Sequence, residues 1–359
     1  RTAIATSCTM GDVRTLAERL ASADACADPR GTLESFQSLL EIVSGGLDEA
    51  LLVAVCRAFA EAGGCKGAIH CMNVTALQST KLANAIDPSK PPTMTDPGVQ
   101  AMLVMGELHT AGCTLLSNLA AAAEPQCLEA LKASSAVAAV VTSLRLYPDN
   151  QEHAEAGVAA LMQLLPSDVG GALAASAPAA ICAAMQSKTV RPWLLYLGTR
   201  ALTHLLKAGD EAKGQVLSAK GLDALLAAAR APPGEDPPEW GVTDLSAKLQ
   251  VAARLAIADV VGFEGFECMG RAPGMLAVNL FLRQDPVVLF GLQSNPDLNG
   301  SVGIVISAGD KGIGPEEESG RYGVKIEYPD ERKGETIRVK PDNLRLMAPD
   351  AGDSAPNGA

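Results

Sequence analysis

The chain contains 359 residues with a formal net charge of −12 at pH 7, and 48% of its residues are hydrophobic although only 3% are aromatic. This acidic balance argues against a nucleic-acid-binding protein, because such proteins gather Lys and Arg to displace the counterions of phosphates. With so few aromatic residues, burial depends on Ala, Leu and Val, whose small side chains favour closely stacked helices over a sandwich of sheets.

Cysteine use and hydropathy bear on the compartment. The nine cysteines are an odd number scattered through apolar segments, where Cys56 and Cys182 resemble small core residues, and this use is typical of a reducing, intracellular compartment. No apolar run approaches the roughly 18 residues of a membrane span, so we expect a soluble protein without a transmembrane segment. Because the chain begins at Arg1 and lacks a secretory leader, we expect it in the cytoplasm, or in an organelle interior after removal of a targeting peptide.

The helical part begins with a segment at 1–30 that we interpret as an N-terminal helical cap. The clearest repeated unit spans 136–165. Its first apolar helix is predicted to end near Pro148, Asp149 and Glu152 then have the spacing of a capping box, and a second helix follows with apolar residues at i, i+3 and i+4. The pattern therefore predicts a helix, a break and a second helix.

The same order recurs along the chain, as a whole or through its second helix alone. The segments that repeat it are 50–63, 111–122, 179–206 and 221–261. Two Pro-bearing stretches interrupt the pattern, at 86–98 and 231–241, and are predicted to be loops inside repeats rather than lost repeats.

This alternation resembles the armadillo repeat, and the sequence "TLLSNLA" at Thr114–Ala120 matches the most recognisable segment of that family. The resemblance covers 31–265 and implies a mainly α fold, an armadillo-like right-handed α-superhelix with a concave groove. In that family, an asparagine on the last helix of each repeat faces the groove and binds the backbone of an extended peptide.

Alignment on "LSNL" places five polar residues at equivalent positions: Arg57, Asn118, Gln163, His204 and Asp259. The resemblance implies that they line a groove that binds a peptide or partner; alternatively, they are solvated residues on an exposed helix face. The charge is basic at Arg57 and acidic at Asp259, which predicts a partner that carries both charges. The tryptophans of nuclear-import adaptors are missing four residues before these positions, which argues against a receptor for nuclear-localisation signals.

Beyond a Gly-rich linker at 266–284 the periodicity changes. Between 285 and 348, five short β-prone runs are separated by Gly, Pro, Asn and Asp, which predicts a small all-β SH3-like barrel. Its motifs "LNG" and "GRY" resemble a module of algal and protist multidomain proteins. Glycines that suit the turns or bulges of such a barrel are Gly300, Gly303 and Gly320. The remaining 349–359 is expected to be a disordered tail.

The contact candidates of the β module are aromatic. Only Phe290, Tyr322 and Tyr328 are available for a cage around a cation. Tyr322 and Tyr328 are an even number of residues apart, so they share one strand face if no bulge intervenes, and they serve either the core or a ligand contact. Acidic residues outnumber basic ones in this module, which argues against RNA.

Residues for catalysis or metal binding do not form a recognisable pattern. The glycines of "GDKGIG" precede no helix that would cradle a phosphate. Cys65, His70 and Cys71 cluster near Cys56, but their spacing matches no standard zinc motif, so we interpret the thiols as packed core residues. The other histidines have no nucleophile beside them in the sequence.

These features predict a non-enzymatic protein–protein interaction scaffold without metal or cofactor. We expect it to be an accessory subunit of a larger hetero-oligomeric assembly, in the cytoplasm or an organelle, with other proteins as its partners. The alternative is a transient peptide-recognition adaptor that binds an extended segment in the armadillo groove.

Overall fold

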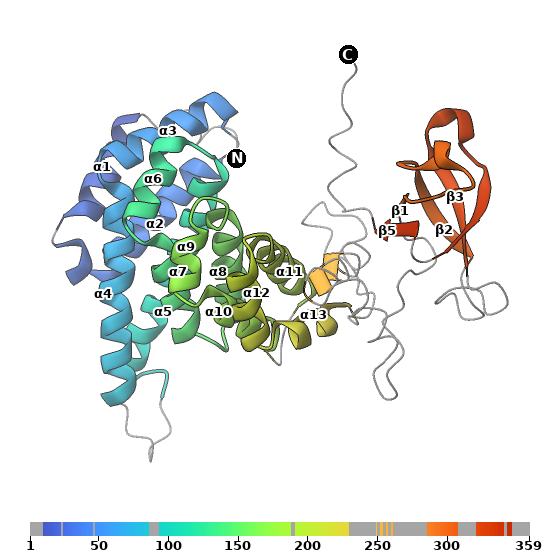
Figure 1. The fold of residues 1–359 in the computed structure, drawn as a ribbon. Helices are drawn as coiled ribbons and strands as arrows, with labels where there is room; N and C mark the ends of the chain where they lie inside the picture. The colour runs from blue at the N-terminus through green and yellow to red at the C-terminus, as the bar shows by residue number, and fades with distance from the viewer. Residues whose placement is uncertain are drawn as a thin grey trace. The chain divides into compact units, whose positions relative to one another are not determined.

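Figure 1 shows the protein as a computed structural model. The structure describes residues 10–22, 24–45, 47–85, 93–187, 191–229, 249, 252, 253, 256, 257, 260, 286–307, 321–340 and 343–346. The chain divides into two compact units, Arg1–Ala224 and Leu225–Ala359. The first is helical and the second contains a small antiparallel sheet, which confirms the predicted change from helical to β structure. The expected linker at 266–284 and tail at 349–359 lie outside the described residues.

The helices are short for the most part and follow one another closely. Their bounds are α1 (Met10–Ala21), η1 (Ala25–Ala27), α2 (Pro29–Val43), α3 (Glu49–Glu61), α4 (Gly64–Ala85), α5 (Pro97–Ala121), α6 (Pro125–Ala133), α7 (Ala136–Leu146), α8 (Gln151–Leu164), α9 (Val169–Ala174), α10 (Ala177–Met185), α11 (Pro192–Leu206), α12 (Asp210–Ser218) and α13 (Gly221–Ala229). The helix–break–helix prediction over 136–165 is confirmed by α7 and α8. The cap of α8 is Asn150, whose side chain accepts from the His153 amide at 3.0 Å, so the predicted capping box at Asp149 was wrong by one residue.

Helices far apart in the sequence lie side by side in two layers of the helical unit (Figure 1). In one layer, which we call the long-helix layer, α2 packs on α5, α5 on α8, and α8 on α11. In the other, α1 packs on α4, α4 on α7, and α7 on α10. The layers are joined by α4 on α5, α7 on α8 and α10 on α11. Each successive group of about three helices therefore contributes one helix to each layer.

A small residue recurs where the two layers meet. Gly112, Gly157 and Gly198 lie on α5, α8 and α11. A Cβ on Gly157 would lie 2.6 Å from Leu144 Cδ2, and one on Gly198 would lie 2.5 Å from Met185 Cγ. At Gly112 the nearest atom would be the sulfur of Met72, at 2.8 Å. These distances are too short for a real Cβ, so glycine lets each long helix approach its partner in the other layer.

The segment 50–63 does not form the second helix of a repeat unit equivalent to 111–122, as the pattern predicted. It forms α3, which packs against α1 and α6 rather than between α2 and α5. The place of a long helix before α5 is taken by α2. Both helices bury one apolar side, so the hydrophobic period alone does not distinguish them.

The five predicted strand runs are all confirmed. They form β1 (Pro286–Leu289), β2 (Val302–Ser307), β3 (Tyr322–Tyr328), β4 (Thr336–Val339) and β5 (Leu344–Leu346). All pairs are antiparallel, in the order β4-β3-β2-β1-β5, so the last strand lies beside the first. The buried core of this sheet consists of Val287, Leu289, Leu298, Val305, Tyr322, Val324, Ile326, Val339 and Leu344.

Two of the singled-out glycines have distinct conformational roles. Gly300 has φ of +90°, which an L side chain rarely adopts. At Gly303 an added Cβ would lie 2.6 Å from Val324 Cγ1 and 2.7 Å from the Lys325 carbonyl oxygen. The register of β2 against β3 shifts between Val302 and Gly303, and the extra residue lies on β3, so Gly303 is beside the irregularity and is not itself the bulged residue. Gly320 lies outside the described residues.

Within the described part of the chain, no helix is both long and apolar enough to cross a bilayer alone. The consecutive helices α6 and α7 reach that length and hydropathy only together, and they are bent by 61°.

Replacing Gly157 by Ala should destabilise the helical unit by about 1–3 kcal/mol, because the new methyl overlaps Leu144 between α7 and α8. Chemical denaturation followed by circular dichroism measures this change. The matched control is Gly214→Ala on α12, where an added Cβ meets no atom within 4 Å; it should gain about 0.5–1 kcal/mol from helix propensity. Leu144→Ala combined with Gly157→Ala should cost less than the sum of the two changes, and additivity would contradict the overlap.

The β module should be separable from the helices, because the composition changes and a Gly-rich passage at 262–274 lies between the two patterns in the sequence. Residues 1–265 expressed alone are expected to unfold cooperatively with a strong helical circular dichroism signal. Loss of that signal would contradict the prediction and would mean that the β module is needed to cap the last helices.

Candidate functional site

The exposed side of the long-helix layer holds three of the five predicted site residues. Asn118, Gln163 and His204 lie on α5, α8 and α11, and all three are half-buried. The Asn118 side-chain amide donates to Ser44 Oγ at 3.2 Å, just beyond the end of α2. Since amide side chains have two donors and one acceptor oxygen, Asn118 keeps capacity for a further partner.

Arg57 is not part of this set. It lies on α3, where its Nε is 3.1 Å from Oε1 of the buried Glu124, the N-cap of α6. The prediction that Arg57 is equivalent to Asn118 was therefore wrong. The equivalent position on α2 is Glu41, which is exposed. Asp259 lies outside the described residues.

The signal that identifies Glu41 is the small residue six positions earlier. Buried small residues occupy that place before each polar residue of the layer, namely Ser35, Gly112, Gly157 and Gly198. Ala253, six residues before Asp259, is also fully buried, whereas Leu51, six residues before Arg57, is 42% exposed. We call Glu41, Asn118, Gln163 and His204 the polar row.

On α11 the polar row is joined by aromatic and basic side chains. Trp193 and Tyr196 are stacked with ring centroids 5.7 Å apart. Arg200 donates to the Tyr196 hydroxyl at 3.1 Å, and its guanidinium carbon lies 5.8 Å from the centre of that ring. The pKa of His204 is lowered by partial burial and by the positive charges of Lys207 and Arg200.

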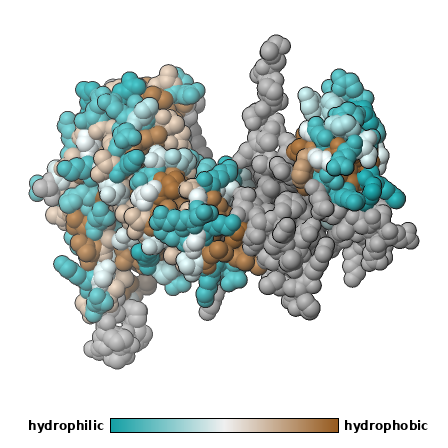
Figure 2. Space-filling view, viewed as in Figure 1, coloured by the Kyte–Doolittle hydropathy of each residue, from teal (hydrophilic) through white to brown (hydrophobic). Residues whose placement is uncertain are grey.

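Figure 2 shows that hydrophilic and hydrophobic residues are interspersed over the visible side of the helical unit. The large hydrophobic side chains that are exposed on helices include Leu77 and Leu103, at 65% and 48%. They lie on α4 and α5, the two longest described helices.

Two histidines that are far apart in the sequence meet in the core. His109 Nδ1 lies 2.7 Å from Ser143 Oγ, and His153 Nε2 lies 3.0 Å from the same oxygen. The remaining ring nitrogens contact Thr75, at 3.2 Å from His109 Nε2, and Thr110, at 3.3 Å from His153 Nδ1. This histidine network joins helices α4, α5, α7 and α8, so it ties the two layers together.

The histidine network has the atoms of a Ser–His pair but not the access that catalysis needs. Ser143, His109 and His153 are all fully buried. Burial and the neighbouring His153 lower the pKa of His109 to about 3, and burial lowers the pKa of His153 to about 4. Both rings are therefore neutral at pH 7, and each is positioned by hydrogen bonds rather than poised beside a cavity. Sequence spacing could not reveal this network because its members come from four helices.

The thiols of η1, α4 and α6 form two separate buried contacts. Cys26 and Cys71 have their sulfurs 3.5 Å apart, and Cys65 and Cys127 have theirs 3.7 Å apart. Cys65 and Cys71 therefore contact different helices, and His70 is exposed. Within the described ranges, no three His, Cys, Asp or Glu side chains are placed to hold a metal ion.

The core role predicted for Cys56 and Cys182 is confirmed, since both are buried. Burial raises the pKa of the Cys182 thiol to about 12. A hydrogen bond with Cys127 and burial raise the pKa of the Cys56 thiol well above its ordinary value. Because the thiolate is the reactive form, neither sulfur has the character of a nucleophile.

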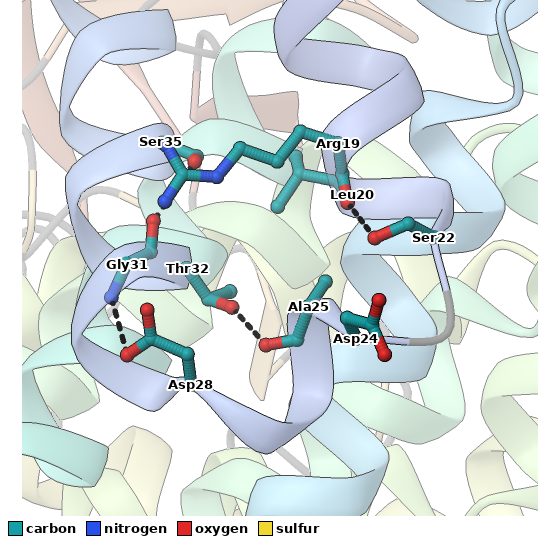
Figure 3. A pocket seen from close by; sticks show the side chains of 9 residues that line it. All are labelled: Arg19, Leu20, Ser22, Asp24, Ala25, Asp28, Gly31, Thr32 and Ser35. Carbon is teal, nitrogen blue, oxygen red and sulfur yellow. Dashed lines mark hydrogen bonds between the residues drawn. The ribbon is translucent and has the colours of Figure 1, made fainter.

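A cavity of about 240 Å³ lies between the end of α1, η1 and the start of α2 (Figure 3). Its polar groups serve local structure: Asp28 accepts from the Gly31 amide at 3.0 Å, Thr32 donates to the Ala25 carbonyl at 2.6 Å, and Ser35 donates to the Gly31 carbonyl at 2.9 Å. Ligand pockets of proteins are usually larger, at about 300–1,000 Å³. This cavity is better explained by the turn into α2 than by a ligand.

The two tyrosines of the β module lie on different faces. Tyr322 is fully buried in the core of the sheet, whereas Tyr328 is 63% exposed. In the pairing of β2 with β3, Val302 is opposite Tyr328 and Gly303 is opposite Ile326, so an extra residue of β3 interrupts the alternation. The shared strand face therefore does not form. Tyr322 serves the core, and of the two only Tyr328 is exposed for a contact.

No protein-family model, no curated protein and no solved structure matches this chain. The arrangement of its own residues is therefore the basis for any functional conclusion.

Acid should destabilise the protein through the histidine network. Because the folded pKa values of about 3 and 4 lie below the ordinary histidine pKa of 6.5, the unfolded chain binds more protons between about pH 4 and 6.5. Each histidine therefore contributes to the free energy of unfolding above pH 6.5. This contribution is lost as pH falls toward the pKa values of the folded state, by about 2 kcal/mol per histidine between pH 7 and pH 5. Denaturant unfolding at both pH values measures the loss.

The variant His153→Gln should reduce this acid dependence by the share of one histidine. The control His70→Gln, on the exposed side of α4, should leave it unchanged. Equal acid dependence in the wild type and in His153→Gln would contradict the assignment.

Proposed function

We propose that the protein is a non-enzymatic interaction scaffold whose helices form an armadillo-like right-handed superhelix and whose sheet is an SH3-like barrel. The observation that carries the proposal is the recurrence of one arrangement on four adjacent helices. On α2, α5, α8 and α11, a buried small residue is followed six positions later by a member of the polar row. Such repetition places hydrogen-bonding side chains at regular steps along one surface, which suits an extended partner.

The barrel part of the proposal is supported by the strand arrangement. Five antiparallel strands of three to seven residues place β1 between β2 and β5, and register shifts interrupt the pairing of β2 with β3. Short strands with bulges curl strongly, as closure of a small barrel requires. Exposed Tyr328 is its contact candidate.

A binding role is favoured over catalysis by the chemistry of the reactive side chains. The Ser–His contacts and the described thiols of the helical unit are buried, and within the described ranges no metal-binding cluster is present. The side chains of the polar row, by contrast, are hydrogen-bond donors and acceptors that lie on four different helices. We therefore propose other proteins as the partners and, from the free thiols, a reducing compartment.

The scaffold is proposed as a lasting subunit of a hetero-oligomeric assembly, and a transient adaptor for extended peptides is the alternative. Both use the same surface, so they are separated by stoichiometry. Size-exclusion chromatography with mass spectrometry on extracts of the native source should show a subunit co-migrating at fixed ratio with its partners. A chain that elutes mostly alone would support the adaptor.

Replacing Asn118 and Gln163 together by Ala should weaken the partner by about 1–3 kcal/mol, because each side chain contributes about 0.5–1.5 kcal/mol of net hydrogen bonding. This corresponds to about 5- to 150-fold in affinity. Titration of the purified partner against the full chain measures the change, and folding should hardly change.

The matched control is Asn73→Ala with Gln215→Ala, which removes the same two residue types from α4 and α12. It should leave affinity unchanged. The proposal fails if the double variant at Asn118 and Gln163 binds as tightly as this control.

A further inference from the structure

Charge is distributed unevenly along the long-helix layer. The segment from Arg191 to Lys207, which contains α11, has three Arg or Lys residues and no Asp or Glu. Helices α5 and α8 have no Lys or Arg, and α2 has only Arg30. The exposed acidic residues of those three helices are Glu34, Glu41, Glu107 and Glu152. The layer is therefore acidic at α2 and basic at α11.

The basic end is also the aromatic end. Trp193, Tyr196, Arg200, His204 and Lys207 follow one another at steps of three or four residues, so they lie along one side of α11. We call them the α11 cluster. Tyr196 is 8% exposed beneath the half-buried Trp193 and Arg200, so its ring and the bond to its hydroxyl orient the guanidinium.

Positive charge accumulates at this end of the layer. Arg191 is offset by Glu155 of α8, at 3.8 Å. Partial burial lowers the pKa of His204, and the positive charges of Lys207 and Arg200 lower it further. Several positive charges close together favour an anionic ligand. The stacked rings of Trp193 and Tyr196 beside them favour a ring or an apolar side chain of that ligand.

We propose that the α11 cluster binds the acidic part of an extended peptide, whose basic part lies toward the glutamates of α2, α5 and α8. This inference rests on the proposed function and names the chemistry of its partner. Packed helices are about 8–10 Å apart, so the three steps from α2 to α11 span about 30 Å. An extended chain advances about 3.3 Å per residue, so about nine residues reach from one end to the other.

The occupant is a peptide rather than a nucleic acid because the layer carries both charges. A polyanion would meet the exposed glutamates on three of the four helices, and the whole chain has a net charge of −12. A peptide with separated charges meets an opposite charge at both ends. The partner is thus a segment with Lys or Arg at one end and with Asp or Glu near an aromatic residue at the other.

The test is selection of a phage-displayed library of random 12-residue peptides on the full-length protein. Selected sequences should place acidic and aromatic residues at one end and basic residues at the other. A synthetic peptide of the best sequence should lose about tenfold or more in affinity with Lys207→Glu, and further with Arg200→Glu added, because rim charges then repel it. Lys207 lies at the C-cap of α11 and is exposed, so Lys207→Glu should fold normally.

The matched control is Lys132→Glu on α6, an exposed lysine away from the layer, and it should retain affinity. Selected peptides that need Asn118 and Gln163 but show no charge separation and no loss with Lys207→Glu would overturn this inference and leave the proposed function standing. Peptides unaffected by either set of variants would overturn both. A single-stranded poly(U) oligonucleotide that binds as tightly as the peptide and is lost with Lys207→Glu would overturn the assignment to a peptide.

Discussion

Close approach of paired helices at one small residue is the constraint on which the helical unit depends. Because aromatic residues make up only 3% of the chain, the core is filled mainly by aliphatic and sulfur side chains. Side chains of this kind pack against the long helices at Gly112, Gly157 and Gly198. The contact fixes how each long helix is rotated about its axis. Because a helix turns about 100° per residue, a residue six positions later is held about 120° away from the packed side. The core thereby orients Asn118, Gln163 and His204.

The local sequence pattern predicted the elements well where residues typical of turns separate them. All five strands were predicted because Gly, Pro, Asn and Asp separate short β-prone runs. The sequence did not predict which residues of β3 share a face. The extra residue between Ile326 and Tyr328 is set by the pairing with Val302 and Gly303 of β2. A bulge of this kind depends on the partner strand, and alternation along one strand does not contain it.

The candidate site was predicted in part for a similar reason. Asn118, Gln163 and His204 share a layer because their segments repeat the same spacing, whereas Arg57 lies on a helix whose apolar period looks alike but which packs on α1 and α6. The discriminating residue is Leu51, which is exposed where the long helices bury a small side chain. Which side of an amphipathic helix meets which neighbour is a tertiary property, so hydrophobic period alone assigned the wrong helix.

The histidine network shows how the layer keeps its register without using the residues of its exposed side. Ser143 serves both His109 and His153, and each ring has a second partner. A buried donor or acceptor without a partner costs about 1–3 kcal/mol, so sliding α5 and α8 along α4 and α7 would break several bonds together. An all-apolar interface would tolerate such sliding more readily. Core polarity therefore holds the helices in place, so the exposed side of the layer can carry polar and basic side chains that the packing of the helices does not require.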